Sequence, residues 1–139
     1  MIVGKGCEMI SNAVTEVMNK DQFPLILGGD HSIGAGSLAG VLKARPNTGV
    51  IWVDAHADIN TPDTSSSRNM HVMPISCLMP NVLNSNNVPG FEWLSSPEYE
   101  AVRLDPNSIV YVGLRDVDEM EQEFIIIIEF ITLQSGLKT

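Results

Sequence analysis

The sequence places side chains that bind divalent metals directly after apolar segments, in short stretches far apart in the chain. These stretches are Gly28–Ser32 (GGDHS), Asp54–Asp58 (DAHAD) and Asn69–His71 (NMH), and they contain all three histidines of the 139 residues. The first two follow runs that are typical of buried strands. Because parallel strands end at the same edge of a sheet, ligands placed there can converge on one point. The sequence therefore predicts a metal site.

The central stretch gives the strongest indication. It follows Gly49–Val53, which is short, apolar and rich in β-branched residues, as expected for a strand covered on both faces. Asp54, His56 and Asp58 come at alternate positions, so they point the same way if the extended backbone continues. Carboxylate oxygen with imidazole suits Mn²⁺, Mg²⁺ or Fe²⁺, and a carboxylate such as Asp54 or Asp58 can bridge two ions. The alternative, a solvated turn, leaves charges beside a buried strand without compensation.

His31 alone is a weaker indication, because a histidine at the start of a helix is more often structural. Phe23–Leu27 reads as another buried strand, and the two glycines after it allow a tight turn. Ser32 or Asp30 is expected to cap the helix that follows. The neighbouring Asp54–Asp58 stretch makes a ligand role the better interpretation of His31.

Strands and helices alternate along the chain, which predicts an α/β fold with a parallel sheet between two helical layers. The expected helices cover about residues 6–20 and 32–44, and a short one begins within 71–78. The inward residues of the first two helices are expected to be Met9, Ile10, Ala13, Val14, Val17, Ile33, Leu38, Val41 and Leu42. The expected strands are 24–27, 50–53 and 108–113, residues 61–69 form a loop, 81–106 are mostly irregular, and the isoleucine run 125–128 is a fourth strand or a helix remnant.

Composition limits the partners. The net charge of −9 argues against nucleic-acid binding, which needs clustered cations. No apolar run reaches the length of a membrane span. Cys7 and Cys77 are isolated, as is usual in a reducing compartment, and the first residues show neither a signal peptide nor a transit peptide. The expected location is cytoplasmic or mitochondrial.

Three motifs together carry a family resemblance. Gly28–Ser32, Trp52–Pro62 (WVDAHADINTP) and Tyr111–Asp118 (YVGLRDVD) resemble the ureohydrolase superfamily and, within it, the arginase family. The resemblance runs from about Val3 to Glu121. It implies a single, partial arginase-like domain over residues 1–139, hydrolysis of L-arginine to L-ornithine and urea by water activated between two Mn²⁺ ions, and a homo-oligomer.

The resemblance also implies roles for single residues. His31, Asp54 and Asp58 match ligands of one manganese ion, His56 matches a ligand of the other, and Asp54 bridges the two. His71 matches a histidine that shuttles protons or contacts substrate, and is the candidate catalytic residue. The candidate substrate-binding residues for the α-carboxylate of the substrate are Asn60 and Ser67, with Asn69 beside them. Those for its α-amino end are Asp118 and Glu121.

The departures from the family pattern lead to further expectations. A second Asp-x-Asp metal motif, a later glutamate and a first strand of the family are not found in these 139 residues. We therefore expect at most one weakly held Mn²⁺ and little arginine hydrolysis by this chain, with apolar surface exposed along residues 125–128. Arg68 and Val72 stand where the family usually has glycine.

Two other functions stay open. One is a non-catalytic truncated chain, either inert or associated with full-length subunits. The other is an agmatinase-type ureohydrolase, although agmatinases usually carry another acid soon after the central motif, where this chain has Ile59–Pro62 (INTP). Asp116 and Asp118 also have a simpler interpretation, in which one of them forms an ion pair with Arg115.

Overall fold

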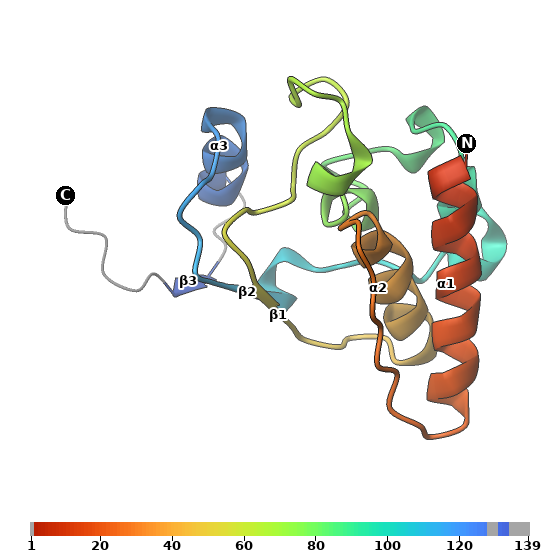
Figure 1. Ribbon diagram of the computed structural model, residues 1–139. Coiled ribbons are helices and arrows are strands. Elements are labelled where there is room, and N and C mark those ends of the chain that lie inside the picture. The colour runs from red at the N-terminus through yellow and green to blue at the C-terminus, as the bar shows by residue number, and fades with distance from the viewer. Residues whose placement is uncertain (1, 128–130, 134–139) are drawn as a thin grey trace.

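The computed structural model describes residues 2–127 and 131–133. Its helices and strands follow the order α1 (Ile2–Asn19), α2 (Ile33–Ala44), β1 (Val50–Val53), β2 (Ile109–Val112), α3 (Glu119–Ile127) and β3 (Ile131–Leu133), with short 3₁₀ helices between Met70 and Ser108. The strands form one sheet in the order β1-β2-β3, and both pairings are parallel. Figure 1 shows α1 and α2 side by side on the right, and α3 on the left, above β3. The predicted α/β class with a parallel sheet is confirmed.

The two long helices pack through small residues. The buried residues of α1 are Gly4, Cys7, Ser11 and Val14. Those of α2 are Gly34, Ala35, Gly36, Ala39, Gly40 and Leu42. The predicted apolar face of α1 is wrong for Met9 and Ala13, which are exposed, and on α2 only Leu42 of the expected inward residues is fully buried. Small side chains are favoured at these positions because they let the backbones of α1 and α2 approach closely.

Gly36 marks the closest approach and gives a test of this packing. A Cβ atom at Gly36 would lie 2.4 Å from the Cys7 carbonyl oxygen and 2.8 Å from its Cα, and backbone atoms cannot turn aside. Gly36→Ala is therefore expected to lower the free energy of unfolding by roughly 1–3 kcal/mol. Gly6→Ala is the matched control, because nothing lies within 4 Å of its added Cβ and alanine favours helix by roughly 0.5–1 kcal/mol. Urea denaturation measures both, and equal stability of the two variants would contradict the close packing.

β1 lies at one edge of the sheet, and it is covered on one face only. Val50 and Trp52 are buried, whereas Ile51 and Val53 are 73% and 74% exposed. The predicted burial on both faces is therefore wrong for this strand. β2 is better covered, with Ile109 and Tyr111 fully buried.

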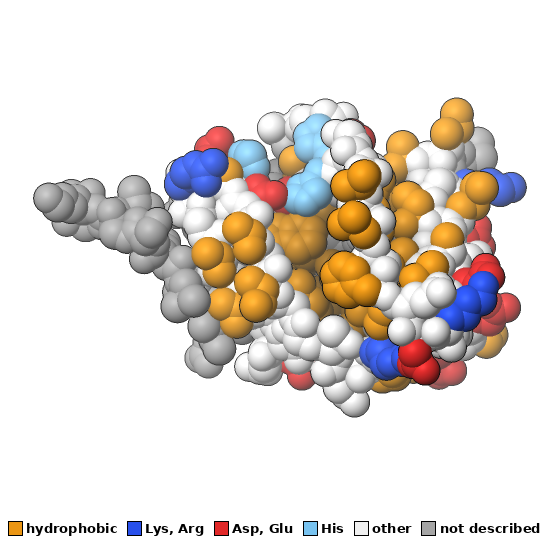
Figure 2. Space-filling view, turned by 60° about the horizontal axis from the view of Figure 1, so that its bottom comes forward, with side chains coloured by type: hydrophobic (Ala, Val, Ile, Leu, Met, Phe, Trp, Pro, Cys, Tyr) orange, Lys and Arg blue, Asp and Glu red, His pale blue; other side chains and the backbone are white. Residues whose placement is uncertain are grey.

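The predicted strand at residues 24–27 is also wrong. The segment is not in a ladder with any strand that the structure describes, and Phe23, Leu25 and Leu27 are 88%, 76% and 86% exposed. Figure 2 shows apolar side chains on both sides of a hollow, with the histidine side chains gathered at one end of it. The apolar sequence of residues 24–27 does not by itself make a strand, because a strand also needs a hydrogen-bonding neighbour.

The irregular region 81–106 provides much of the core. Phe91, Leu94, Tyr99, Val102 and Leu104 are all buried, although the backbone forms only short 3₁₀ turns. The region is also tied to α1 by side-chain hydrogen bonds, from Trp93 Nε1 to the Gly4 carbonyl (3.1 Å) and from the Tyr99 hydroxyl to Asn12 Oδ1 (3.0 Å). The prediction of an irregular backbone is confirmed.

The isoleucine run 125–128 begins in a helix, which is one of its two predicted forms. Residues 125–127 belong to α3, where Ile125 is half-buried and Ile126 is 75% exposed, and β3 begins only after the run, at Ile131. The expected exposure is thus confirmed at Ile126, and residue 128 lies outside the described residues.

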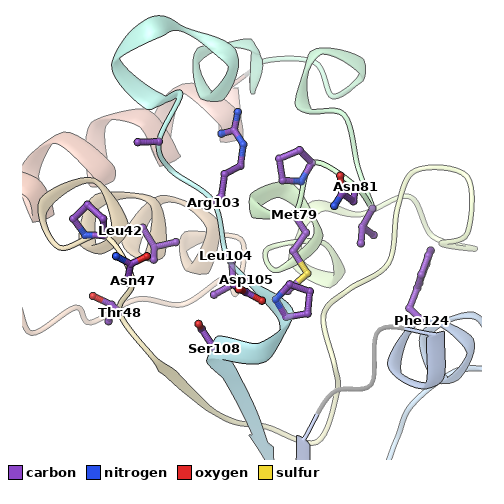
Figure 3. A pocket seen from close by; sticks show the side chains of 15 residues that line it. Leu42, Asn47, Thr48, Met79, Asn81, Arg103, Leu104, Asp105, Ser108 and Phe124 are labelled. Atoms are coloured by element: carbon purple, nitrogen blue, oxygen red, sulfur yellow. The ribbon is translucent and has the colours of Figure 1, made fainter.

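A large cavity lies at the end of the sheet opposite the metal-ligand motifs. It has a volume of about 910 Å³, and its lining includes Thr48 and Ser108, which precede β1 and β2 (Figure 3). None of the candidate metal or substrate residues lines it.

Within the described part of the chain, no helix combines the length and apolar character needed to cross a membrane.

Candidate metal centre

The chain segments that follow β1 and β2 stay together beyond the ends of the strands. The amide of Asp54 donates to the Val112 carbonyl (3.1 Å), and the amides of Arg115 and Asp116 both donate to the Ala55 carbonyl (2.9 and 3.0 Å). These bonds hold the two loops side by side at the carboxyl edge of the sheet, where the sequence predicted convergence. Arg115 does not take the predicted ion pair there: its guanidinium donates to the Gly113 carbonyl, 3.1 Å away.

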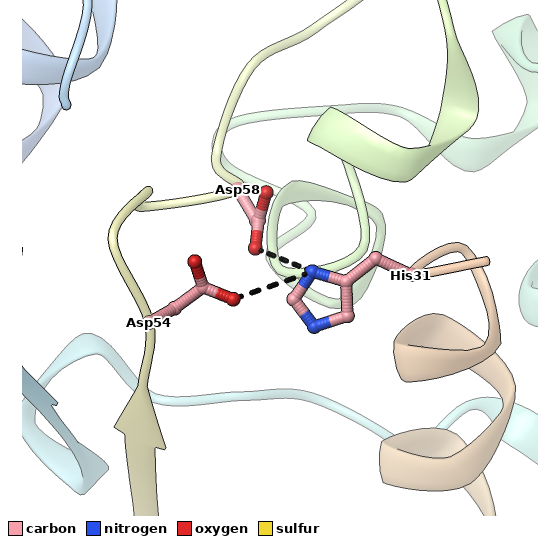
Figure 4. Close-up of side chains that lie close together, drawn as sticks. All are labelled: His31, Asp54 and Asp58. Carbon is pink, nitrogen blue, oxygen red and sulfur yellow. Dashed lines mark ion pairs between the residues drawn. The ribbon is translucent and has the colours of Figure 1, made fainter. Parts of the chain in front are cut away.

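Three of the predicted ligands meet at this edge. His31 Nδ1 lies 3.0 Å from Asp58 Oδ2 and 3.5 Å from Asp54 Oδ2 (Figure 4). One ligand atom from each residue can be chosen so that all three atoms lie within 4.8 Å of one another. A single ion at the roughly 2.0–2.6 Å distances of hard-cation ligands can contact such a set.

Asp54 also connects the cluster to His56. Its other oxygen, Oδ1, lies 3.3 Å from His56 Nδ1 and accepts a hydrogen bond from the His56 amide (2.9 Å). The Asp54 carboxylate thus presents one oxygen to His31 and the other to His56. On its far side, His56 Nε2 lies 3.3 Å from Asp116 Oδ2.

The spacing of Asp54, His56 and Asp58 suggests that they alternate along an extended backbone, and the structure shows that they do not. Residues 54–56 form a bend, and Asp58 has a φ of 54°, in the left-handed region. This geometry turns Asp58 inward, so that the residue is only 2% exposed. Burial raises the pKa of the Asp58 carboxyl, an effect that nearby His31 opposes.

His31 reaches the cluster from the turn before α2. Asp30 Oδ1 accepts a hydrogen bond from the Ser32 amide (2.9 Å), whereas the Ser32 side chain makes no capping bond. Ser32 is therefore the N-cap residue of α2 by position, and Asp30 bonds to the Ser32 amide rather than to an amide of the helix. The His31 ring stacks on Trp52, with ring centres 5.0 Å apart and an angle of 20° between the planes.

The predicted substrate-binding residues Asn60 and Asp118 lie together. Asn60 Nδ2 donates to Asp118 Oδ2 (2.6 Å), and Asn60 Oδ1 accepts from the Thr64 hydroxyl (2.8 Å). Glu121 is only 3% exposed, and its Oε1 accepts from the Ile59 amide (3.2 Å). Burial raises the pKa of Glu121 to about 7. The structure thus places the Glu121 carboxyl under the loop rather than at its surface.

Ser67 and Asn69 lie in the predicted loop, on its exposed side. The Ser67 hydroxyl accepts from the Asn69 amide (3.3 Å) and is 3.3 Å from the Ser65 hydroxyl. Between them, Arg68 has a φ of 55°, a conformation that glycine adopts more easily. This agrees with the glycine expected there, whereas Val72, the other replaced glycine, belongs to the 3₁₀ helix Met70–Val72 and shows no positive φ.

His71 does not belong to the group of His31, Asp54 and Asp58, whose ligand atoms lie within 4.8 Å of one another. It lines a hollow of about 440 Å³, together with Asn69, Asp30 and residues of the first turns of α1. Its predicted catalytic role stays a prediction, as do the substrate roles of Asn69 and Ser67.

Comparison with known proteins gives a consistent result. The model of the arginase family matches residues 2–135. The chain belongs to the arginase family. It is 48% identical over 120 residues to Arginase-1 of Xenopus laevis and 44% identical over 120 residues to human Arginase-1, and these alignments cover 86% of this chain. The arginase of Bacillus cereus has a similar structure, with a TM-score of 0.79, 37% identity and coverage of 94% of this chain and 43% of that one.

The match covers only part of these arginases. The chain spans 36% of the length of the Xenopus laevis protein and 35% of the human one. The fold is therefore an incomplete arginase fold.

Two residues that contact the candidate ligands were not predicted as part of the site. Trp52 belongs to the predicted strand 50–53 and to the Trp52–Pro62 motif without a predicted role of its own, but its indole Nε1 donates to Asp58 Oδ2 (3.3 Å). Asp116 belongs to the Tyr111–Asp118 motif, and a pair with Arg115 is its simpler interpretation, but in the structure Asp116 faces His56. Position gives a usable signal for Asp116, since it follows β2 as Asp54 follows β1. A buried indole needs an acceptor, which is the signal for Trp52.

Proposed function

We propose that this chain carries the first metal-binding segments and part of the substrate pocket of a manganese-dependent arginase, which hydrolyses L-arginine to L-ornithine and urea. One observation carries the proposal: Asp54 faces His31 with one carboxylate oxygen and His56 with the other, while Asp58 completes the cluster on the His31 side. Family membership agrees with this activity, and the chain spans about a third of the arginases that it matches.

The donor set fits a hard divalent cation. It consists of imidazole nitrogens and carboxylate oxygens, and the two cysteines are buried elsewhere as free thiols. Nitrogen and oxygen donors of this kind suit Mn²⁺, whereas thiolates would favour zinc or copper(I). His31, Asp54 and Asp58 would hold one ion, and His56 with the shared Asp54 would contribute to a second. Mn²⁺ bound there supplies a Lewis acid that lowers the pKa of water and makes a nucleophile available near neutral pH.

The chain's own residues bind and orient the substrate in this proposal. Asn60 and Asp118 are hydrogen-bonded neighbours beyond the cluster, and an amide beside a carboxylate suits the α-carboxylate and α-ammonium groups of an amino acid. Glu121 holds the Ile59 amide and so fixes the backbone between Asp58 and Asn60. His71 would exchange protons with solvent from its exposed position.

The same pair of residues favours arginine over agmatine, the decarboxylated analogue. A site that offers hydrogen bonds to an α-carboxylate leaves its polar groups unpaired when that carboxylate is missing.

The inactive-chain alternative concerns the 139 residues by themselves, because they supply only His56 and Asp54 toward the second ion. The cytoplasmic or mitochondrial location, the single domain and the homo-oligomer also stay predictions.

A chimera tests the proposed function. In it, residues 3–121 replace the corresponding segment of Arginase-1 from Xenopus laevis, the 48% identical relative. With Mn²⁺, the chimera is expected to release urea from arginine and to use agmatine at least about 100-fold less efficiently. The 139-residue chain assayed alone is the control and is expected to release little urea. A folded chimera without arginase activity, or one that uses both substrates equally, would contradict the proposal.

A further inference from the structure

The Trp52 side chain contacts two of the candidate metal ligands at once. Its indole Nε1 donates to Asp58 Oδ2 (3.3 Å), and its ring stacks on His31 at 5.0 Å. Trp52 comes from the core side of β1 and is 9% exposed. Tyr111, by contrast, contacts the backbone of the central motif, because its hydroxyl donates to the Ala57 carbonyl (2.9 Å).

We propose that Trp52 is a positioning residue of the metal centre, which fixes the orientation of the Asp58 carboxylate through its indole N–H and the plane of the His31 imidazole through stacking. The inference rests on the proposed metal site, and it adds a residue to that site that binds neither metal nor substrate. Groups that orient ligands in this way commonly change metal affinity by roughly 10–100-fold.

The chemistry of the indole suits this role. Indole N–H is a donor only, so it cannot compete with Asp58 for a cation. A carboxylate oxygen has more than one lone pair, and Asp58 Oδ2 can accept from Trp52 while it faces His31. The indole keeps Asp58 Oδ2 on the side of His31. The two candidate metal ligands, Asp58 Oδ2 and His31 Nδ1, therefore already point to the same space before an ion binds.

The fold holds Trp52 itself in place. A Cβ atom at Gly34 would lie 3.1 Å from Cη2 of Trp52, so α2 packs against the ring through a glycine. In β1, Trp52 pairs with Tyr111 of β2, which is fully buried. The ring is therefore clamped between the sheet and α2, and it can transmit this rigidity to His31 and Asp58.

The test compares variants that differ in the indole N–H. Trp52→Phe keeps an aromatic ring for stacking but removes the donor, and Trp93→Phe is the matched control, because Trp93 donates to the Gly4 carbonyl instead. Free Mn²⁺ measured by electron paramagnetic resonance gives the affinity of each protein. Trp52→Phe is expected to bind Mn²⁺ roughly 10-fold more weakly than the parent, and Trp93→Phe is expected to bind within about 2-fold of it.

A second variant removes the donor without changing the shape of the ring. In the Trp93→Phe protein, Trp52 is the remaining tryptophan, and it can be replaced by benzothienylalanine, in which sulfur takes the place of N–H. This protein is expected to melt at the same temperature as its tryptophan parent and to bind Mn²⁺ roughly 10-fold more weakly. Equal Mn²⁺ affinity of the two proteins would overturn the role of Trp52 but leave the proposed metal site standing. Failure of the Trp93→Phe parent to bind Mn²⁺ would overturn the metal site, and this inference with it.

Discussion

Asp54→Asn is expected to weaken Mn²⁺ binding by at least about 100-fold. Asp54 is the residue on which both halves of the site depend, since Oδ2 lies 3.5 Å from His31 Nδ1 and Oδ1 lies 3.3 Å from His56 Nδ1. Asparagine keeps the size of the side chain but replaces one oxygen by an NH₂ donor and removes the negative charge. Because loss of a residue that only orients ligands already costs up to about 100-fold, loss of a shared ligand is expected to cost no less.

A charge-matched control separates ligand loss from a general electrostatic effect. Asp63→Asn removes the same charge from an exposed position in the loop that follows the cluster. Titration of each protein with Mn²⁺ is expected to leave Asp63→Asn close to the parent. Parallel losses in the two variants would show that net charge, rather than ligation, attracts the ion, and unchanged binding by Asp54→Asn would remove Asp54 from the site.

The sequence contained enough information to predict that His31, Asp54 and Asp58 converge, because chemistry and topology agreed at the motifs that follow β1 and β2. Asp54 follows β1, Asp116 and Asp118 follow β2, and the parallel pairing brings the two strand ends together. His31 joined the prediction only because the neighbouring motif supported it. The details of orientation were beyond the sequence, since the bend after β1 and the left-handed backbone of Asp58 depend on tertiary contacts.

The errors in the fold arise from the same cause. The residues at 24–27 have the composition of a buried strand, but strand formation depends on a neighbouring strand that no local pattern reveals. The faces of α1 and α2 are predicted from their large apolar residues, of which the structure buries Val14 and Leu42. Most of the other buried residues are small ones, including Cys7, Ser11 and Gly36. Helix periodicity finds the larger apolar stripe, whereas close helix packing selects the smaller residues.

Glu121 is expected to make the stability of the protein fall as the pH rises from about 4.5 to about 7. Its carboxyl is buried beside Asp118 and Asp58, and burial raises its pKa from the ordinary 4.5 to about 7. Between these values the folded chain binds more protons than the unfolded one, so the contribution is complete at low pH and is lost by pH 7. At about 1.4 kcal/mol per pH unit, this contribution amounts to about 3 kcal/mol as an upper bound.

Glu121→Gln isolates this contribution. Glutamine keeps an oxygen that can accept from the Ile59 amide, but it cannot ionise, so the variant is expected to lose most of the decline in unfolding free energy between pH 4.5 and 7. Glu119→Gln removes a charge from an exposed position in the same turn of α3 and is expected to keep the decline. Urea denaturation at a series of pH values measures all three proteins, and an unchanged slope in Glu121→Gln would refute the assignment. Saturating Mn²⁺ gives an independent check, because a cation beside Asp58 lowers the pKa of nearby carboxyls and should flatten the decline in the parent protein.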